Sequence, residues 1–112
     1  MEVNGKTYPL WSQFVETQEK WVGGTLEDSG DAFDRAMEVK KLTTKITGIE
    51  LNPNGETDAF FQVVGKDFTC GFSVEHGGIR AGEEGWITFS GYGGHTWRIK
   101  QKVHDENNKV KE

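Results

Sequence analysis

The segment DFTCGFSV, residues 67–74, alternates between two kinds of side chain. Phe68, Cys70, Phe72 and Val74 are apolar, and the residues between them are small or polar. A period of two is typical of a β-strand with one buried face, because successive side chains of a strand point to opposite faces of the sheet. The segment therefore predicts a strand that buries the single thiol of the chain.

Two further strands are predicted before this one. KITGIEL, residues 45–51, is rich in β-branched residues and stops at the turn sequence NPNG, residues 52–55. NPNG suits a type I turn whose glycine takes a positive φ. TDAFFQVV, residues 57–64, then returns as the partner strand.

The C-terminal part predicts a second hairpin. GWITFSG, residues 85–91, directs Ile87 and Phe89 to one face, and HTWRIKQK, residues 95–102, directs Trp97 and Ile99 to one face. GYGG between them is interpreted as the turn. HGGIRAGEEG, which precedes this hairpin, is predicted to be a loop. Residues 44–102 thus predict a five-stranded, mostly antiparallel sheet.

The N-terminal part has the spacing of a helix instead. In residues 9–22 apolar side chains follow the i, i+4 pattern of one helical face, and Pro9 stands at the start, where its missing N–H costs nothing. Gly23 and Gly24 are predicted to end this helix. Ser29 or Asp31 is predicted to cap a second, short helix.

These elements predict a single α+β domain over residues 1–112. A helical segment of about residues 9–40 packs on the β-rich segment of about residues 44–102, followed by a charged tail of about residues 103–112. The predicted core consists of Leu10, Phe14, Trp21, Ile49, Leu51, Phe61, Val63, Phe68, Cys70, Phe72, Val74, Ile87, Phe89, Trp97 and Ile99.

ITGIEL, FTCGFSV and GEEGWITFSG together resemble the strands of a small OB-type β-barrel over residues 45–101. The resemblance implies a closed barrel, with an SH3-like barrel as the alternative. An open sheet covered by the N-terminal helix fits the same pattern. The segment EHGGIRAGEE departs from the OB plan, because it is too short and too glycine-rich for a regular helix.

Composition limits the classes of function. The formal charge is −5, which disfavours general phosphate-driven binding of nucleic acid. One cysteine allows no internal disulfide and favours a reducing compartment. No apolar run reaches the roughly 20 residues that span a bilayer, and the N-terminus lacks the pattern of a signal peptide. We therefore expect a cytoplasmic protein.

The motifs of common cofactor and metal sites are absent from the sequence. GYGGH fits no phosphate-binding loop. The candidate soft metal ligands match no zinc spacing; they are Cys70, His76, His95 and His104. No catalytic residue, metal or cofactor is predicted.

The leading functional hypothesis is a non-enzymatic protein-interaction module of the adaptor or inhibitor type. Aromatic side chains dominate interface hot spots, and acidic groups around them favour a basic partner. The predicted contact residues are Trp21, Glu27, Asp28, Asp31 and Asp34, with the loops of residues 77–94 beside them.

The alternative hypothesis is a single-stranded nucleic-acid-binding domain. Cations alternate onto one face of the last strand, beside aromatic rings that can stack on bases. The residues concerned are Trp86, Tyr92, Arg98, Lys100 and Lys102. A small-molecule-binding protein or a small enzyme is the third hypothesis.

Overall fold

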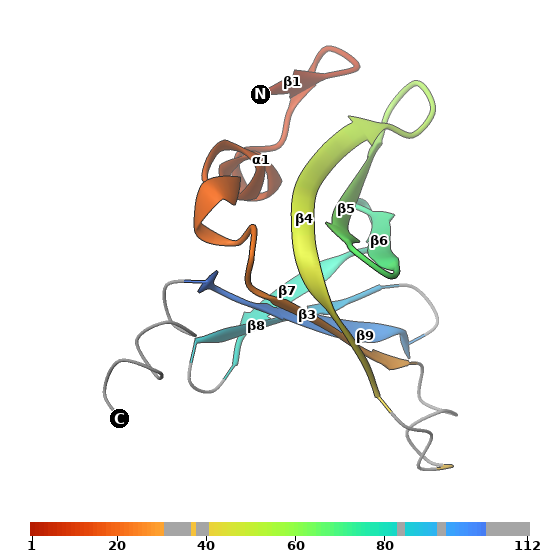
Figure 1. The fold of residues 1–112 in the computed structure, drawn as a ribbon. Coiled ribbons are helices and arrows are strands. Elements are labelled where there is room, and N and C mark those ends of the chain that lie inside the picture. The colour runs from red at the N-terminus through yellow and green to blue at the C-terminus, as the bar shows by residue number, and fades with distance from the viewer. Residues whose placement is uncertain (31–36, 38–40, 83–84, 92–93, 103–112) are drawn as a thin grey trace.

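A computed structural model of the chain describes residues 1–30, 37, 41–82, 85–91 and 94–102. Figure 1 shows a short helical region beside a large, strongly bent sheet. The α+β class predicted from the sequence is therefore confirmed. Within the described residues, no helix has the length and apolar character that crossing a membrane requires.

A small hairpin precedes the helical region. Strand β1 (Glu2–Val3) pairs with β2 (Lys6–Thr7) around Asn4 and Gly5, which both have a positive φ. The Asn4 side chain donates a hydrogen bond of 2.7 Å to the backbone oxygen of Asp58. This bond ties the N-terminal hairpin to the turn between two strands of the large sheet.

The predicted helix of residues 9–22 is shorter in the structure. Helix α1 (Pro9–Glu16) is followed at Thr17 by the 3₁₀ turn η1 (Gln18–Lys20). The Thr17 hydroxyl donates to the backbone oxygen of Gln13 at 2.6 Å, a local bond that competes with regular helix. Gly23, with φ of 94°, then turns the chain toward the sheet.

The prediction of a second helix capped at Ser29 is wrong. Residues Thr25–Gly30 form strand β3, which lies between two other strands of the large sheet. Tertiary pairing on both sides outweighs the low strand propensity of the sequence TLEDSG. Asp31, the alternative cap, and most of the proposed second helix lie outside the described residues.

All strand pairs of the large sheet are antiparallel. Its order is β6-β5-β4-β3-β9-β8-β7. Besides β3, its strands are β4 (Leu42–Pro53), β5 (Ala59–Gly65), β6 (Thr69–Ser73), β7 (Gly78–Ala81), β8 (Trp86–Ser90) and β9 (Thr96–Lys100).

The sheet therefore has seven strands rather than the predicted five. Strand β3 lies within the segment of about residues 9–40 that was predicted to be the helical part, and β7 lies in the segment expected to be a loop. No pairing among the described residues joins the edge strands β6 and β7, so the sheet is not closed into a barrel. The resemblance to an OB-type barrel is not confirmed.

Strand β4 is shared by the two halves of the sheet. Its first residues pair with β3, and Ile46–Pro53 pair with β5. A register shift between Ile46 and Gly48 marks a β-bulge, which bends and twists a strand locally. As a result, the β4-β5-β6 half crosses the β3-β9-β8-β7 half at a steep angle (Figure 1).

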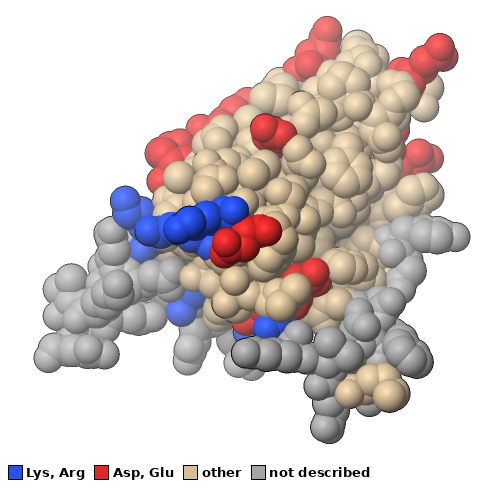
Figure 2. Space-filling view, turned by 45° about the vertical axis from the view of Figure 1, so that its right-hand side comes forward, with Lys and Arg blue, Asp and Glu red and all other residues tan. Residues whose placement is uncertain are grey.

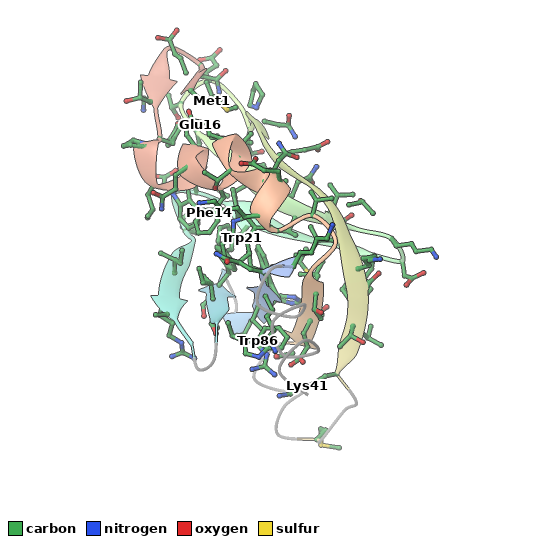
Figure 3. The ribbon with its side chains drawn as sticks, turned by 60° about the vertical axis from the view of Figure 1, so that its left-hand side comes forward. Met1, Phe14, Glu16, Trp21, Lys41 and Trp86 are labelled. Carbon is green, nitrogen blue, oxygen red and sulfur yellow. The ribbon has the colours of Figure 1, made fainter. Side chains whose placement is uncertain are left out.

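Aromatic rings fill the space between the two halves and α1. Phe61, Phe89 and Trp97 are fully buried, and Phe89 stacks on Trp97 with ring centroids 4.3 Å apart. From the helical region, Phe14 contacts Trp21 at 5.7 Å and points into the same space (Figure 3). The alternation of buried and exposed side chains predicted for residues 67–74 is confirmed at Cys70 and Phe72.

Leu10 is a wrong core prediction. It is 45% exposed, whereas Trp11 on the next position of α1 is buried. The helix is short, and its buried residues are Trp11, Ser12 and Phe14. Five buried apolar residues were missed by the core prediction, namely Val3, Trp11, Leu26, Ile46 and Ala59.

One carboxylate is buried at the turn before β5. Burial alone would raise the pKa of Asp58, but hydrogen bonds from Ser73 and from the backbone of Ala59 and Glu75, with the charge of His76, lower it below 3.8. Hydrogen bonds to a charged group satisfy it and stabilise the folded state. Asp58 therefore holds the end of β6 against the β4–β5 turn.

Candidate functional site

The face of the sheet turned away from the aromatic core is called the outer face here. On strands β4, β3, β9 and β8 it carries the side chains that alternate with buried ones. The strand register sets one row of residues side by side across these four strands: Lys45, Thr25, Lys100 and Trp86. The neighbouring row is Thr43, Glu27, Arg98 and Thr88.

Trp86 is the aromatic ring of this face. The Arg98 guanidinium carbon lies 4.0 Å from the centroid of the Trp86 ring, and the Lys100 ammonium nitrogen lies 5.5 Å from it. Both distances fall within the range of cation–π attraction. Trp11, Trp21 and Trp97 are buried, whereas Trp86 is half-buried and keeps contact with solvent.

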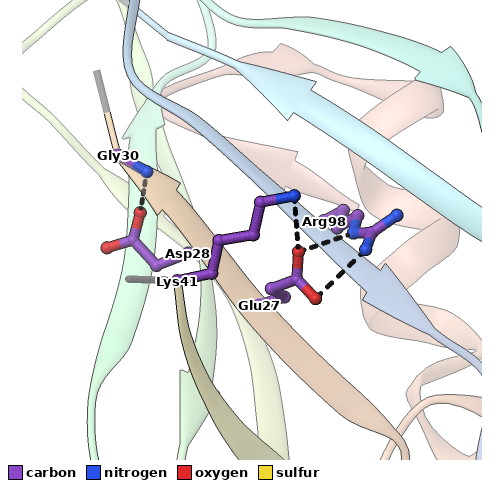
Figure 4. A network of polar contacts seen from close by, with 5 residues as sticks. All are labelled: Glu27, Asp28, Gly30, Lys41 and Arg98. Carbon is purple, nitrogen blue, oxygen red and sulfur yellow. Dashed lines mark hydrogen bonds and ion pairs between the residues drawn. The ribbon is translucent and has the colours of Figure 1, made fainter. Parts of the chain in front are cut away.

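Glu27 holds Arg98 in this position. Arg98 donates from Nε and from an Nη to the two carboxylate oxygens of Glu27, at 3.0 and 3.1 Å (Figure 4). The Lys41 ammonium lies 3.6 Å from the same carboxylate. Such a two-bond pair fixes the plane of the guanidinium, and here that plane lies against Trp86.

Among the described residues, basic side chains outnumber acidic ones around this ring. We call the set the basic band, and it consists of Lys41, Lys45, Arg80, Arg98 and Lys100. Figure 2 shows a row of lysine and arginine side chains gathered in one place, whereas most carboxylates in that view lie elsewhere. Figure 3 places Lys41 and Trp86 at the end of the molecule opposite Met1 and Glu16.

The residues predicted for nucleic-acid binding are only partly brought together. Trp86, Arg98 and Lys100 form one group. Lys102 follows the end of β9 and lies close to Gly23, where an added Cβ would stand 2.9 Å from its Cδ. Tyr92 lies outside the described residues.

The residues predicted for protein binding do not form one surface. Trp21 is 5% exposed and belongs to the core. Glu27 points to the outer face, and Asp28 points to the inner face, where its carboxylate pairs with His95 at 3.0 Å. Asp31 and Asp34 lie outside the described residues.

A second group of polar side chains lies on the inner face, at the open corner between β3 and the edge strand β6. Asp28, Cys70 and His95 each place a potential ligand atom within 4.8 Å of the other two. An open hollow of about 330 Å³ borders all three residues. We call them the Asp28–Cys70–His95 cluster.

The Cys70 thiol is held in its neutral form. Burial, together with the negative charge of Asp28, raises the pKa of Cys70 to about 12. The sequence hypothesis treated the cysteine and the histidines as dispersed residues. Cys70 and His95 come together because the half of the sheet that contains β6 crosses the half that contains β3 and β9, and no local spacing in the sequence signals that crossing.

Searches against models of known protein families, curated proteins and solved structures find no match for this chain. Its function therefore has to be argued from the geometry of these two groups of residues.

Proposed function

We propose that the outer face binds single-stranded nucleic acid, with Trp86 as the stacking platform. The supporting observation is the position of Trp86 beside Arg98 and Lys100 within the basic band. Proteins that bind single strands without base pairing combine such a ring with a positively charged path for the backbone. The net charge of −5 is that of the whole chain, whereas among the described residues of the band Glu27 is the acidic side chain that pairs with Lys41 and Arg98.

The arrangement also favours a single strand over a duplex. A base can stack only on a ring that it can reach, and the bases of a duplex are already stacked on one another. Trp86 lies on a sheet face and not on a projecting helix or loop that would enter a groove. The sheet face around Trp86 is therefore the surface that would take unpaired bases.

A labelled oligo(dT) and fluorescence anisotropy test this function. Trp86→Ala should weaken binding about 5- to 150-fold, because one base–aromatic stack contributes about 1–3 kcal/mol. Lys100→Ala should weaken it as well and should reduce the slope of log K against log salt by about 0.7, the value for one lost phosphate contact.

Lys6→Ala is the matched control, because Lys6 belongs to the N-terminal hairpin, remote from the basic band. It should leave affinity and salt slope unchanged. The proposal fails if oligo(dT) does not bind at low salt, if a duplex of the same length binds better, or if Lys6→Ala weakens binding as much as Lys100→Ala.

Protein binding is the second candidate function, and exposed Leu42 favours it. Leu42 is 55% exposed and pairs with Asp28 across β4 and β3, beside the acidic segment predicted to contact a partner. A Glu27→Gln substitution separates the two functions. It removes the carboxylate that balances Arg98, so it should strengthen oligo(dT) binding, whereas a basic partner protein would bind less tightly.

A further inference from the structure

We infer that Asp28, Cys70 and His95 form a binding site for a divalent transition-metal ion of the zinc type. The three residues would supply one oxygen, one sulfur and one nitrogen ligand, and the fourth coordination position would face the hollow beside them. This inference does not rest on the nucleic-acid proposal, because the cluster lies on the inner face and the basic band on the outer face.

The chemistry of the ligands selects the ion. Thiolate and imidazole groups favour zinc and its neighbours in the first transition row, whereas magnesium and calcium prefer sites made of oxygen alone. A set of three protein ligands with one open position is the arrangement found where zinc keeps a bound water molecule. The hollow of about 330 Å³ has room for that water.

The distances require only small shifts on binding. With zinc–ligand bonds of about 2.0–2.3 Å, the ligand atoms of a tetrahedral site lie roughly 3.5 Å apart. In the cluster the His95 Nε2 lies 3.0 Å from the Asp28 Oδ1, and all ligand atoms lie within 4.8 Å of one another. Movements of about 1 Å therefore suffice, and the exposed His95 ring can make them.

The surroundings orient the ligands. The backbone N–H of Gly30 donates to the Asp28 Oδ1 at 2.8 Å and fixes the carboxylate (Figure 4). Such outer partners of metal ligands hold them in the binding geometry. A cation bound between the Asp28 carboxylate and Cys70 would stabilise the thiolate form of Cys70. Binding would release the thiol proton to solvent.

Titration with Co²⁺ tests the inference in the intact protein. Co²⁺ serves as a spectroscopic substitute for Zn²⁺, and a thiolate ligand gives it a charge-transfer band in the near ultraviolet. We expect a band that saturates at one ion per chain and disappears when Zn²⁺ is added. Zn²⁺ at about 100 times its Kd should raise the Tm by roughly 10 °C.

The ligand variants make the assignment specific. Asp28→Asn, His95→Gln and Cys70→Ser should each weaken metal binding at least 10- to 100-fold, roughly the loss that outer-shell changes alone produce. His76→Gln is the matched control and should bind as the wild type does. The His95 side chain is 43% exposed, so its variant should fold even if Cys70→Ser does not.

Two outcomes would overturn the inference. One is the absence of a saturable Co²⁺ band in the wild-type protein. The other is a band, or a Zn²⁺-induced rise in Tm, that is unchanged in both His95→Gln and Asp28→Asn, since the metal would then be bound elsewhere.

Discussion

Asp58 is a buried carboxylate whose ionisation contributes to the stability of the fold. The folded pKa of this carboxyl lies below 3.8, its unfolded value, so its contribution to stability is fully present above that pH. As the pH falls through the folded pKa, the carboxylate is protonated and the contribution is lost. Asp58 should therefore be one of the groups responsible for loss of stability in acid.

We expect Asp58→Asn to lower the free energy of unfolding by about 1–3 kcal/mol near pH 7, because the amide places an N–H₂ group among hydrogen-bond donors. The difference from the wild type should shrink in acid, where wild-type Asp58 is itself neutral. Urea unfolding at several pH values measures both effects. Glu56→Gln, at an exposed turn position, is the control and should change stability little. A difference that stays constant down to the lowest pH would contradict this account.

At the residue scale, the sequence could predict on which face of a strand a side chain lies, but not which distant side chain it contacts. Alternation along the last strand placed Arg98 and Lys100 on the side opposite Trp97 and Ile99. It could not show that Arg98 would pair with Glu27, which is 71 residues away. Contacts at such separations depend on strand order, and a single sequence does not encode strand order in any local pattern.

At the scale of elements, Gly24 marks the place where the helical region joins the sheet. A Cβ added at Gly24 would lie 2.0 Å from the backbone oxygen of Lys100 and 2.9 Å from that of Trp21. Both obstacles are backbone atoms, which cannot turn aside as a side chain can. The close approach of η1, β3 and β9 therefore depends on a residue without a side chain.

Gly24→Ala should consequently destabilise the protein by about 3 kcal/mol or more, by forcing the start of β3 away from β9. Thermal unfolding followed by circular dichroism measures the loss. Gly78→Ala is the matched control, because the nearest atom to its added Cβ lies 3.9 Å away. Equal Tm values for the two variants would show that the junction is looser than the structure implies.

Strands with a clear alternation of apolar and polar residues could be predicted from the sequence. Strands that form only because neighbouring strands pair with them could not. The strands from residue 45 to 74 and the hairpin of β8 and β9 have enough β-branched and aromatic residues to be recognised. Strand β3 contains four polar or acidic residues among its six and exists because β4 and β9 flank it. Strand β7 is a four-residue edge strand, and its glycine and arginine are as typical of a loop as of a strand.

At the scale of the whole molecule, the two halves of the sheet enclose Cys70. The residue is only 5% exposed, and its raised pKa keeps it in the unreactive thiol form near neutrality. A small ion can enter the neighbouring hollow, but a bulky reagent needs the halves to separate.

In metal-free protein, we therefore expect Cys70 to react with an aromatic disulfide reagent at least about 1,000-fold more slowly in the native than in the urea-unfolded state. Absorbance of the released thiol gives both rates. The native rate should rise with sub-denaturing urea, because opening exposes buried surface. Immediate reaction of the native protein would show that the corner at β6 is open.

The long strand β4 has a consequence for any attempt to divide this protein. Since one continuous strand pairs with β3 through its first residues and with β5 through Ile46–Pro53, a cut on either side leaves one fragment without its central partner. Neither portion can be expressed as an autonomous unit with all its backbone amides satisfied. A split reporter or a shortened version of this protein would have to keep Leu42–Pro53 intact. It would also have to provide the strands that pair with this segment on both sides.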